Sequence, residues 1–576
     1  MINTKFKSIT EVMESYIERN LIQTGQSFFN SKDKTFDYIS YADLSSQAFS
    51  IGAKLIDRGV EQRNLCMIVC SNPKYQVLYF YACLSINAIP LIIPSPKALS
   101  GNDSLLKKIR DWANNKFSSR TFILIEESGI FEKIASQYTA LKVIKCEEVE
   151  YSNLRKERPI NHTPSANDIA YFQMTSASTG DGKAVAISHG NIINNISGIY
   201  NAVKCKQSEK VCSWLPLYHD MGLVGAELFS FYHGFDLFLM SPYEFLRKPI
   251  RWLETISNNK CTLSPSPNFG FEYASRYINL NKVKDLDLSS WKAGLNGAEP
   301  IRSKTLSKFF VKFKKYGFKP NVILPVYGLA EATLAATFST VGEKPRYVIV
   351  EKRSIKLGTN IVIKSSGVFD PLNPPNINPK SEILSFSVGT AIQGLKVQII
   401  DELQNTNNEE LMCGEISILG NSVAIGYITA EKKNIESFEK KINTGDLGFV
   451  YQGNLYVLER IKNLIIRNGE NYLSSDLENY LSTILGLPEA NIAVFEEDLF
   501  NPESNIIALI EIKPTHDIES ICEILQNNEV IDLPVNRLIL SHKTKVPKTT
   551  SGKKRHFLCR ELLNNEEIDI VQEIIL

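Results

Sequence analysis

The segment 169–192 combines the residue types that bind a polyphosphate. It reads IAYFQMTSASTGDGKAVAISHGNI: a β-rich stretch, then a loop of Ser, Thr and Gly, then a helix predicted to start near Ser188. Small residues let backbone N–H groups face an anion, hydroxyl groups add donors, and Lys183 adds a positive charge. A Walker A loop is disfavoured because Ala177 and Ala184 replace its first Gly and its Ser or Thr. The alternative is a flexible polar surface loop.

Four residues further along the chain could complete a nucleotide site. Tyr327 offers a ring that can stack on adenine. Glu331 is an oxygen ligand of the kind that Mg²⁺ prefers. Asp446 can accept both hydroxyls of a ribose, and Arg460 can donate to the same sugar. Each also has an ordinary structural interpretation (a core Tyr, a tight turn, a surface ion pair), so the prediction depends on their occurring together.

Six segments, in this order, resemble the adenylate-forming enzymes: acyl-CoA synthetases, luciferases and non-ribosomal peptide adenylation domains. They are TSASTGDGKAV (175–185), SWLPLYHDMGLVG (213–225), NGAEP (296–300), PVYGLAEATL (325–334), the stretch 443–472 and PKTTSGK (547–553). The resemblance covers essentially the whole chain. It implies an enzyme that uses ATP and Mg²⁺. The first segment departs from the usual pattern at Ala177, Gly182 and Ala184.

The resemblance also implies roles for individual residues. Lys553 would bridge the substrate carboxylate and the α-phosphate, with Lys548 as a weaker candidate. His219 would help to stabilise the pentavalent state or gate the acyl tunnel, unless it is a packed His beside Asp220. Glu331 would hold the metal. The nucleotide would contact Thr175, Ser176, Ser178, Thr179, Gly180, Lys183, Asn296, Gly297, Ala298, Glu299, Tyr327, Gly328, Glu331, Asp446 and Arg460.

Two features resemble the fatty acyl-AMP ligase branch of this superfamily. SWLPLYHDMGL, NGAEPIR and YGLAEATL are close to its motifs, and 57 residues separate Glu331 from Gly389. The excess length lies within 343–385, where these ligases carry an insertion that CoA ligases lack. We hypothesise that an insertion packed between domains biases their orientation and disfavours the CoA-using state. The alternative is a long surface loop without that role. Ser474 replaces a Pro of the branch pattern, and Lys183 is retained where many members lose it.

The implied reaction activates a medium- or long-chain fatty acid with ATP to acyl-adenylate, releasing pyrophosphate. The acyl group would then pass to the phosphopantetheine of an acyl carrier protein supplied in trans. One alternative is a fatty acyl-CoA synthetase. Another is a catalytically silent adenylate-binding or carrier-docking module, for which the basic run 542–560 could contact an acidic carrier.

The elements around these motifs predict a layered α/β fold with largely parallel sheets. Tyr41 to Asp57 has helical spacing and stops at Gly59; 65–70, 90–94 and 121–126 read as strands, and Lys74 to Asn87 as a helix. The Pro-rich stretch 371–380 is predicted to be loop. The family resemblance implies a large domain (1–460) of αβ-layered subdomains with a small barrel, a hinge (459–463) and a small mobile α+β domain (464–576). The active site would lie between them.

Composition excludes several classes of protein. Of 576 residues, 43% are hydrophobic and 22% charged, which is typical of a globular protein rather than a disordered or collagen-like one. With 64 basic and 63 acidic residues, a general role at nucleic acids or membrane surfaces gains no support, so phosphate recognition must be local. We expect no integral membrane segment, no transition-metal site and, from ten scattered Cys, a cytoplasmic protein with reduced thiols.

Overall fold

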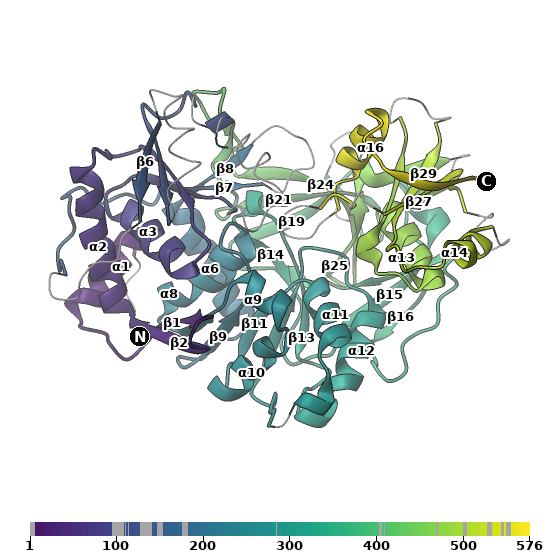
Figure 1. The fold of residues 1–576 in the computed structure, drawn as a ribbon, viewed down its shortest axis with the longest axis horizontal. Coiled ribbons are helices and arrows are strands. Elements are labelled where there is room, and N and C mark those ends of the chain that lie inside the picture. The colour runs from purple at the N-terminus through teal and green to yellow at the C-terminus, as the bar shows by residue number, and fades with distance from the viewer. Residues whose placement is uncertain are drawn as a thin grey trace.

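The structure is a computed structural model of the 576-residue chain. The residues outside its description are 1–5, 95–108, 110, 113–114, 127–140, 147–153, 176–182, 284, 402–405, 408, 468–469, 499–500, 502–503, 527–532, 543–545 and 549–553. Figure 1 shows a broad body of sheets and helices, with the C-terminal elements gathered at one end. None of the described helices is long and apolar enough to cross a membrane.

A nine-stranded sheet forms the centre of the large body. Its order is β18-β14-β13-β12-β11-β9-β10-β1-β2, and the strands from β13 to β1 pair in parallel. The carboxyl ends of these parallel strands lie on one edge, where ligands usually bind in α/β sheets. The bounds are β18 Thr390–Ala391, β14 Ala335–Phe338, β13 Ile323–Gly328, β12 Ala293–Asn296, β11 Leu263–Ser266, β9 Lys210–Ser213, β10 Asp236–Leu239, β1 Gly25–Asn30 and β2 Thr35–Ser40.

Helices pack around this sheet, and side-chain caps mark the starts of some of them. Ser188 and Asn191 form a capping box at the start of the helix that follows the predicted phosphate loop. Four other helices lie further along the chain. They are α9 Pro242–Arg247, α10 Ile250–Asn259, α11 Asn268–Tyr277 and α12 Ser303–Phe313, and the capped helix is α6 His189–Ala202.

The N-terminal segments build a parallel sheet as predicted. Its order is β4-β3-β5-β6, with bounds Ile89–Ile92, Leu65–Val69, Thr121–Ile125 and Leu141–Lys145. The predicted helices are α2 Tyr41–Asp57 and α3 Pro73–Ser85, and α1 spans Ile9–Glu18. Gly59 follows α2 with φ +89°, a conformation that Gly adopts without strain. These element predictions are confirmed.

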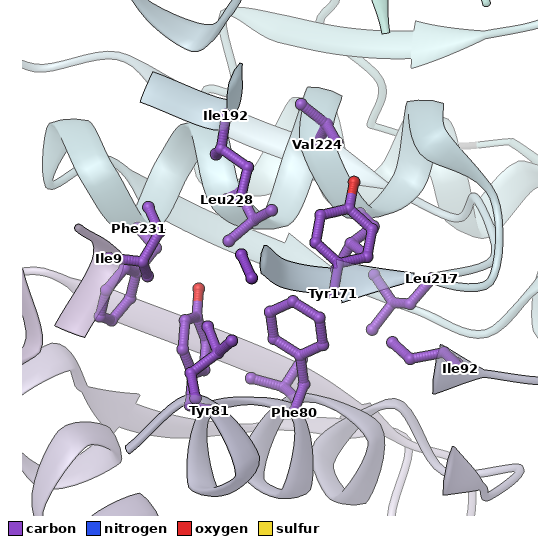
Figure 2. Packing of buried hydrophobic residues seen from close by; sticks show 14 of the residues in the cluster. Ile9, Phe80, Tyr81, Ile92, Tyr171, Ile192, Leu217, Val224, Leu228 and Phe231 are labelled. Carbon is purple, nitrogen blue, oxygen red and sulfur yellow. The ribbon is translucent and has the colours of Figure 1, made fainter. Parts of the chain in front are cut away.

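A buried aromatic cluster joins α3 to the sheet that carries the phosphate loop. Figure 2 shows Phe80 and Tyr81 rising from one helix toward Tyr171, Leu228 and Phe231. The Phe80 and Tyr171 ring centroids are 5.6 Å apart, and those of Tyr81 and Phe231 are 4.4 Å apart. Tyr171 belongs to a sheet ordered β23-β22-β8-β7, with bounds Glu436–Ser437, Gly426–Ile428, Ala184–Ser188 and Ile169–Met174. This packing holds β7 in place, and β8 is paired with it, so the two strands that flank the predicted phosphate loop are both positioned.

Two antiparallel sheets lie between the central sheet and the C-terminal end. Residues 346–386 form a three-stranded sheet (β16-β15-β17) and residues 395–460 a five-stranded one (β20-β19-β21-β24-β25). A bridge between Ser387 and Tyr456 connects them, and together they occupy the place of the expected small barrel. The bounds are β15 Arg346–Glu351, β16 Ile363–Val368, β17 Glu382–Phe386, β19 Leu395–Ile400, β20 Thr406–Asn407, β21 Gly414–Gly420, β24 Lys441–Tyr451 and β25 Asn454–Arg460. The stretch 371–380 is loop, as predicted.

The C-terminal residues form an α+β unit with a core of its own. A four-stranded sheet (β28-β29-β30-β31) packs with helices, and a hairpin of β26 and β27 precedes it. The predicted mixed α/β class is therefore confirmed. The bounds are β26 Leu464–Arg467, β27 Glu470–Leu473, α13 Ser474–Leu485, β28 Ile492–Glu496, β29 Ile506–Glu511, α14 Ile518–Leu525, β30 Arg537–Ser541, α16 His556–Asn564 and β31 Ile570–Ile575.

Candidate active site

A cavity of about 580 Å³ lies at the carboxyl ends of the central parallel strands. This volume is within the range of small-molecule sites. Its lining comes from described residues between Met174 and Lys462 and includes none of the described residues after Lys462. By type of side chain, the lining divides into a polar part and an apolar part. The polar part includes Thr175, Lys183, Glu331, Tyr427, Thr444 and Arg460, and the apolar part Ile199, Met221, Leu295, Leu334 and Phe338.

The predicted nucleotide residues are only partly on the cavity wall. Lining residues among them are Thr175, Lys183, Gly297, Ala298, Tyr327, Gly328, Glu331 and Arg460. Asn296, Glu299 and Asp446 are not on the wall. Asn296 is fully buried, and its side-chain amide has no hydrogen-bond partner among the described residues. Ser176, Ser178, Thr179, Gly180 and Lys553 lie outside the described residues.

Asp446 sits at the junction of two other predicted residues. Asp446 and Arg460 are directly opposite across β24 and β25, and Arg460 Nε lies 3.3 Å from Asp446 Oδ1. The Tyr327 hydroxyl donates to Asp446 Oδ2 at 2.6 Å. Burial, with the Asp446 charge adding to it, raises the pKa of Tyr327 well above its usual range, so this hydroxyl stays protonated. The three residues form one charged and hydrogen-bonded group, of which Tyr327 and Arg460 line the cavity.

Tyr427, which sequence reasoning missed, links the predicted metal ligand to the predicted phosphate lysine. Its hydroxyl donates to Glu331 Oε1 at 2.5 Å, and Lys183 Nζ lies 5.8 Å from the centre of its ring. Tyr427 is positioned by strand pairing, because it faces Val185 across β22 and β8. The Ala424 N–H also donates to the Glu331 carbonyl at 2.9 Å. Some 240 residues separate Tyr427 from Lys183, so no local pattern could have indicated the contact.

The site's donors are chemically suited to Mg²⁺. Glu331 presents a carboxylate on the cavity wall beside Lys183, and Mg²⁺ prefers such oxygen ligands together with substrate phosphates. The described residues hold no cluster of three or more His, Cys, Asp or Glu that would bind a metal without a substrate. The wall therefore offers one oxygen ligand of the kind that Mg²⁺ combines with substrate phosphates.

His219 is another predicted residue on the cavity wall. Its Nδ1 is 2.6 Å from Asp220 Oδ1, and because a carboxylate only accepts, we assign the proton to Nδ1. The Met221 N–H donates to the same Asp220 oxygen at 2.8 Å. Both His219 and Asp220 line the cavity. The short helix α7 Asp220–Gly222 starts here and continues into a π-helix, η3 Leu223–Leu228.

The π-helix contributes Gly225 to the cavity wall. Gly225 and Leu334 both line it, and a Cβ on Gly225 would lie 2.9 Å from Leu334 Cδ2. On the same π-helix, Glu227 is fully buried and accepts hydrogen bonds from Gln26 and from the Tyr81 hydroxyl, the latter at 3.1 Å. Burial raises the pKa of Glu227 to about 7. Glu227 thus ties η3 to β1 and α3 while Gly225 faces the cavity.

Comparison with known proteins agrees with this geometry. Residues 26–428 match the family model described as AMP-binding enzyme. The chain belongs to the AMP-binding enzyme family. It is 27% identical to the medium-chain fatty acid–acyl carrier protein ligase JamA of Moorena producens, over 97% of this chain and 95% of that protein. It is 28% identical to fadD25 of Mycobacterium tuberculosis, named as a putative fatty acid–CoA ligase, over 93% and 94%.

A solved structure extends the comparison to the fold and its ligands. The fatty acyl-adenylate ligase of Legionella pneumophila, in complex with acyl adenylate and pyrophosphate, matches with a TM-score of 0.69 and 27% identity, over 99% of this chain and 98% of that one. The resemblance to fatty acyl-AMP ligases within the adenylate-forming superfamily is therefore confirmed. This AMP-binding enzyme uses ATP, as the superfamily does.

In this enzyme the segment 343–385 contacts the start of the C-terminal unit. Lys352 forms an ion pair with Asp476, and Asn471 Nδ2 donates to the Ile355 carbonyl at 2.6 Å. Buried residues of the segment share one apolar cluster with the five-stranded sheet and with Leu473. The segment is therefore a packed sheet that reaches across to the residues after the predicted hinge.

A second contact to the C-terminal unit comes from the start of α12. Arg302 lies 2.8 Å from Glu489 Oε1 and donates to the Ser475 carbonyl at 2.7 Å. Ser474, where the branch pattern has Pro, donates its hydroxyl to the Asn463 carbonyl at 2.8 Å, a bond that Pro cannot make. The Arg302 contacts stabilise the present placement of the C-terminal unit against the large body.

Lys554, which directly follows the predicted catalytic Lys553, is held by acids. It forms an ion pair with Glu478 and lies 3.6 Å from Glu489 Oε1. His556 Nε2 is 2.6 Å from the other Glu478 oxygen. Burial raises the pKa of Glu478, but the charges of Lys554 and His556 outweigh it and lower the value to about 2. Lys554 is thus anchored inside the C-terminal unit.

Proposed function

We propose that this enzyme activates a medium- or long-chain fatty acid with MgATP to an acyl-adenylate, with release of pyrophosphate. The observation that carries the proposal is one cavity whose polar part holds Lys183, Glu331 and Arg460 and whose apolar part is lined by aliphatic and aromatic side chains. Such a cavity can align a carboxylate against a nucleotide phosphate while burying its alkyl chain. The acyl-adenylate ligase of Legionella pneumophila supports this assignment.

The residues would share the chemistry as follows. Thr175 and Lys183 would hold the β- and γ-phosphates, and Asp446 the ribose hydroxyls, with Arg460 donating to the same sugar. The fatty acid carboxylate would attack the α-phosphorus in line, and pyrophosphate would leave. Glu331 would hold Mg²⁺, which supplies neutralisation of the phosphate charge. His219, with its Nδ1 proton fixed by Asp220, would present Nε2 to the reacting groups.

We propose Lys553 as the group that stabilises charge between the carboxylate and the α-phosphate. Because the described cavity lining ends at Lys462, this lysine would have to reach the cavity from the C-terminal unit. The anchoring of Lys554 by Glu478 supports a fixed loop base from which Lys553 could extend.

We further propose that residues 343–385 hold the C-terminal unit in an orientation that favours adenylation over thiolation by CoA. The Lys352–Asp476 ion pair and the Asn471 hydrogen bond support this role, because rotation of the C-terminal unit would have to break both. The acyl group would then go to the phosphopantetheine of an acyl carrier protein acting in trans. JamA, named as such a ligase, supports the acceptor.

A cytoplasmic location is part of the proposal. The Sγ atoms of Cys70 and Cys146 are 3.7 Å apart without a bond, and all ten cysteines are free thiols. Two thiols that lie this close without forming a disulfide are typical of a reducing compartment.

A fatty acyl-CoA synthetase is the second candidate. Lys183 is retained at the phosphate loop, and fadD25 is named as a putative CoA ligase. A catalytically silent module is disfavoured because Tyr327, Asp446 and Arg460 form a connected group, two of whose members line the cavity.

Fatty acid-dependent exchange of pyrophosphate into ATP tests the proposed activity. We expect exchange with octanoate to palmitate, and its loss in Asp446→Asn and Lys553→Ala. A matched control is Lys54→Ala, an exposed lysine at the end of α2. No exchange by the wild-type enzyme with any fatty acid would contradict the proposed function, and unchanged exchange in Lys553→Ala would contradict the role of that lysine.

A further inference from the structure

Three neighbouring helices, α9, α11 and α12, carry exposed apolar side chains away from the catalytic cavity. Figure 1 shows them beside one another on one side of the large body. Tyr243 is 66% exposed, Tyr277 54%, Val311 50% and Leu246 42%, and none of them lines the cavity. A single exposed apolar residue is ordinary, but a group of them is typical of a contact surface.

Helices α9 and α11 are held together close to their exposed residues Leu246 and Tyr277. The Tyr273 hydroxyl donates to the Leu246 carbonyl at 2.8 Å, which fixes α11 against the end of α9. The ring centroids of Tyr273 and Tyr277 are 4.5 Å apart. The Arg276 guanidinium lies 5.6 Å from the centre of the Tyr277 ring. Aromatic rings and a cation are therefore side by side on this face.

Helices α11 and α12 run side by side in the same direction. Asn268 donates to Thr305 at 3.3 Å. Seven residues further along both helices, Lys312 Nζ donates to the Ser275 carbonyl. Both contacts join residues 37 positions apart, so the two helices keep one register. Their exposed faces therefore form one surface.

The α12 part of this surface is strongly basic although the protein is nearly neutral. Residues 303–319 contain six Lys and no Asp or Glu, against a net charge of +1 for the whole chain. Lys304, Lys308, Val311 and Lys315 recur at helical spacing and are all exposed, while Phe309 on the opposite face is fully buried. The whole chain is nearly neutral, but this segment therefore carries a local excess of positive charge.

We propose that the exposed face of α9, α11 and α12, centred on Tyr243, Leu246, Arg276, Tyr277, Lys308 and Val311, docks on the anionic lipid surface of a membrane. Tyr rings favour the headgroup level, and Lys side chains extend their charge to phosphates while their stems lie on apolar groups. Each cation near an anionic bilayer strengthens binding about fivefold.

The composition of the surface favours lipid over other anionic partners. Protein interfaces are depleted in Lys, which dominates this one. Nucleic acid binding uses cations and stacking rings but gains little from exposed Leu246 and Val311. If the enzyme uses fatty acids as proposed above, their alkyl chains partition from water into bilayers, so docking places the enzyme where its substrate is concentrated.

Co-sedimentation with lipid vesicles tests this proposal without requiring activity. The full-length protein is mixed with vesicles of phosphatidylcholine alone, or of phosphatidylcholine with phosphatidylglycerol, at low and high salt. We expect binding to the anionic vesicles that weakens at high salt. The test variant replaces three exposed lysines of the surface, Lys304→Glu, Lys308→Glu and Lys315→Glu. The control makes the same charge change on the α2–β6 side, with Lys54→Glu, Lys142→Glu and Lys156→Glu.

The two triple variants have different expected outcomes. The α12 variant should lose at least about tenfold in partition to anionic vesicles, because three cations are reversed, and the control should lose much less. A second variant, Tyr243→Ser with Tyr277→Ser, should weaken binding without changing its salt dependence. Absence of wild-type binding, or an equal loss in the control, would overturn the proposal.

Two enzyme assays, pyrophosphate exchange and acyl transfer, separate this proposal from a protein-docking surface and from failure of the proposed function. Pyrophosphate exchange with soluble octanoate should be unchanged in the α12 variant, which shows that it folds. If the variant kept vesicle binding and instead slowed acyl transfer to a carrier protein, the surface would serve a protein and the lipid proposal would be wrong. A wild-type enzyme without exchange would contradict the proposed function but leave the vesicle result intact.

Discussion

Replacing the buried acid of the π-helix should make the protein more stable in alkaline solution. Burial raises the pKa of Glu227 from 4.5 to about 7, so the folded protein favours the neutral acid. Wild-type stability should therefore be complete below about pH 4.5 and should fall as the pH rises through 7. A pKa difference of about 2.5 corresponds to roughly 3 kcal/mol of free energy of unfolding.

Glu227→Gln should abolish this loss of stability at high pH. The amide keeps an oxygen that can accept from Gln26 and Tyr81 and carries no charge to desolvate. We expect the variant to match the wild type near pH 5 within about 1 kcal/mol and to exceed it by roughly 2–4 kcal/mol above pH 8. Tyr81→Phe is the matched control. It removes a donor to the charged form, so its pH dependence should be at least as steep as that of the wild type.

Denaturant unfolding at the two pH values measures the effect. All four Trp lie between 112 and 291, so intrinsic fluorescence reports on the large body that contains Glu227. A stability difference between Glu227→Gln and wild type that is the same at both pH values would refute the reasoning.

Three further predictions concern the site. Tyr427→Phe removes the hydroxyl that orients the metal-binding carboxylate and should raise the Mg²⁺ concentration for half-maximal pyrophosphate exchange about tenfold, with the KM for fatty acid unchanged; an unchanged Mg²⁺ requirement would contradict that role. Gly225→Val should narrow the cavity between residue 225 and Leu334, and should therefore shift the ratio of kcat/KM values from palmitate toward octanoate. An equal loss of kcat/KM for both acids would indicate general damage instead. Lys352→Ala should increase acyl-CoA formation relative to acyl-adenylate, and pairing it with Asp476→Ala in a double-mutant cycle should show that the two act together.

Local sequence signals were sufficient for much of the fold. The apolar spacing from Tyr41 to Asp57, with Gly59 after it, predicted a helix with its end, and Ser188 was recognised as a helix start. These features depend on residues within one or two turns of each other. The mixed α/β class followed from the alternation of such elements.

Several of the residues that the motifs singled out also line one cavity. Lys183, Tyr327, Glu331 and Arg460 all reach one cavity, although they come from distant parts of the chain. The family resemblance, rather than any periodicity, carried that information.

The residues that sequence reasoning missed act through long-range contacts. Tyr427 meets Glu331 only because β22 pairs with β8, and Glu227 meets Gln26 only because the π-helix packs on β1. Arg302 reaches Glu489 across the boundary to the C-terminal unit. None of these side chains differs by itself from an ordinary surface or core residue, so its role becomes visible only when the sheets are assembled.

The central claim is that the enzyme makes acyl-adenylate without passing the acyl group to CoA. The most direct test is a product assay with saturated fatty acids from octanoate to palmitate, MgATP and free CoA, resolving acyl-adenylate from acyl-CoA. The account predicts that acyl-adenylate accumulates without acyl-CoA, and that adding a phosphopantetheinylated carrier protein consumes it. Rapid formation of acyl-CoA would contradict the role given to residues 343–385 and establish a fatty acyl-CoA synthetase instead.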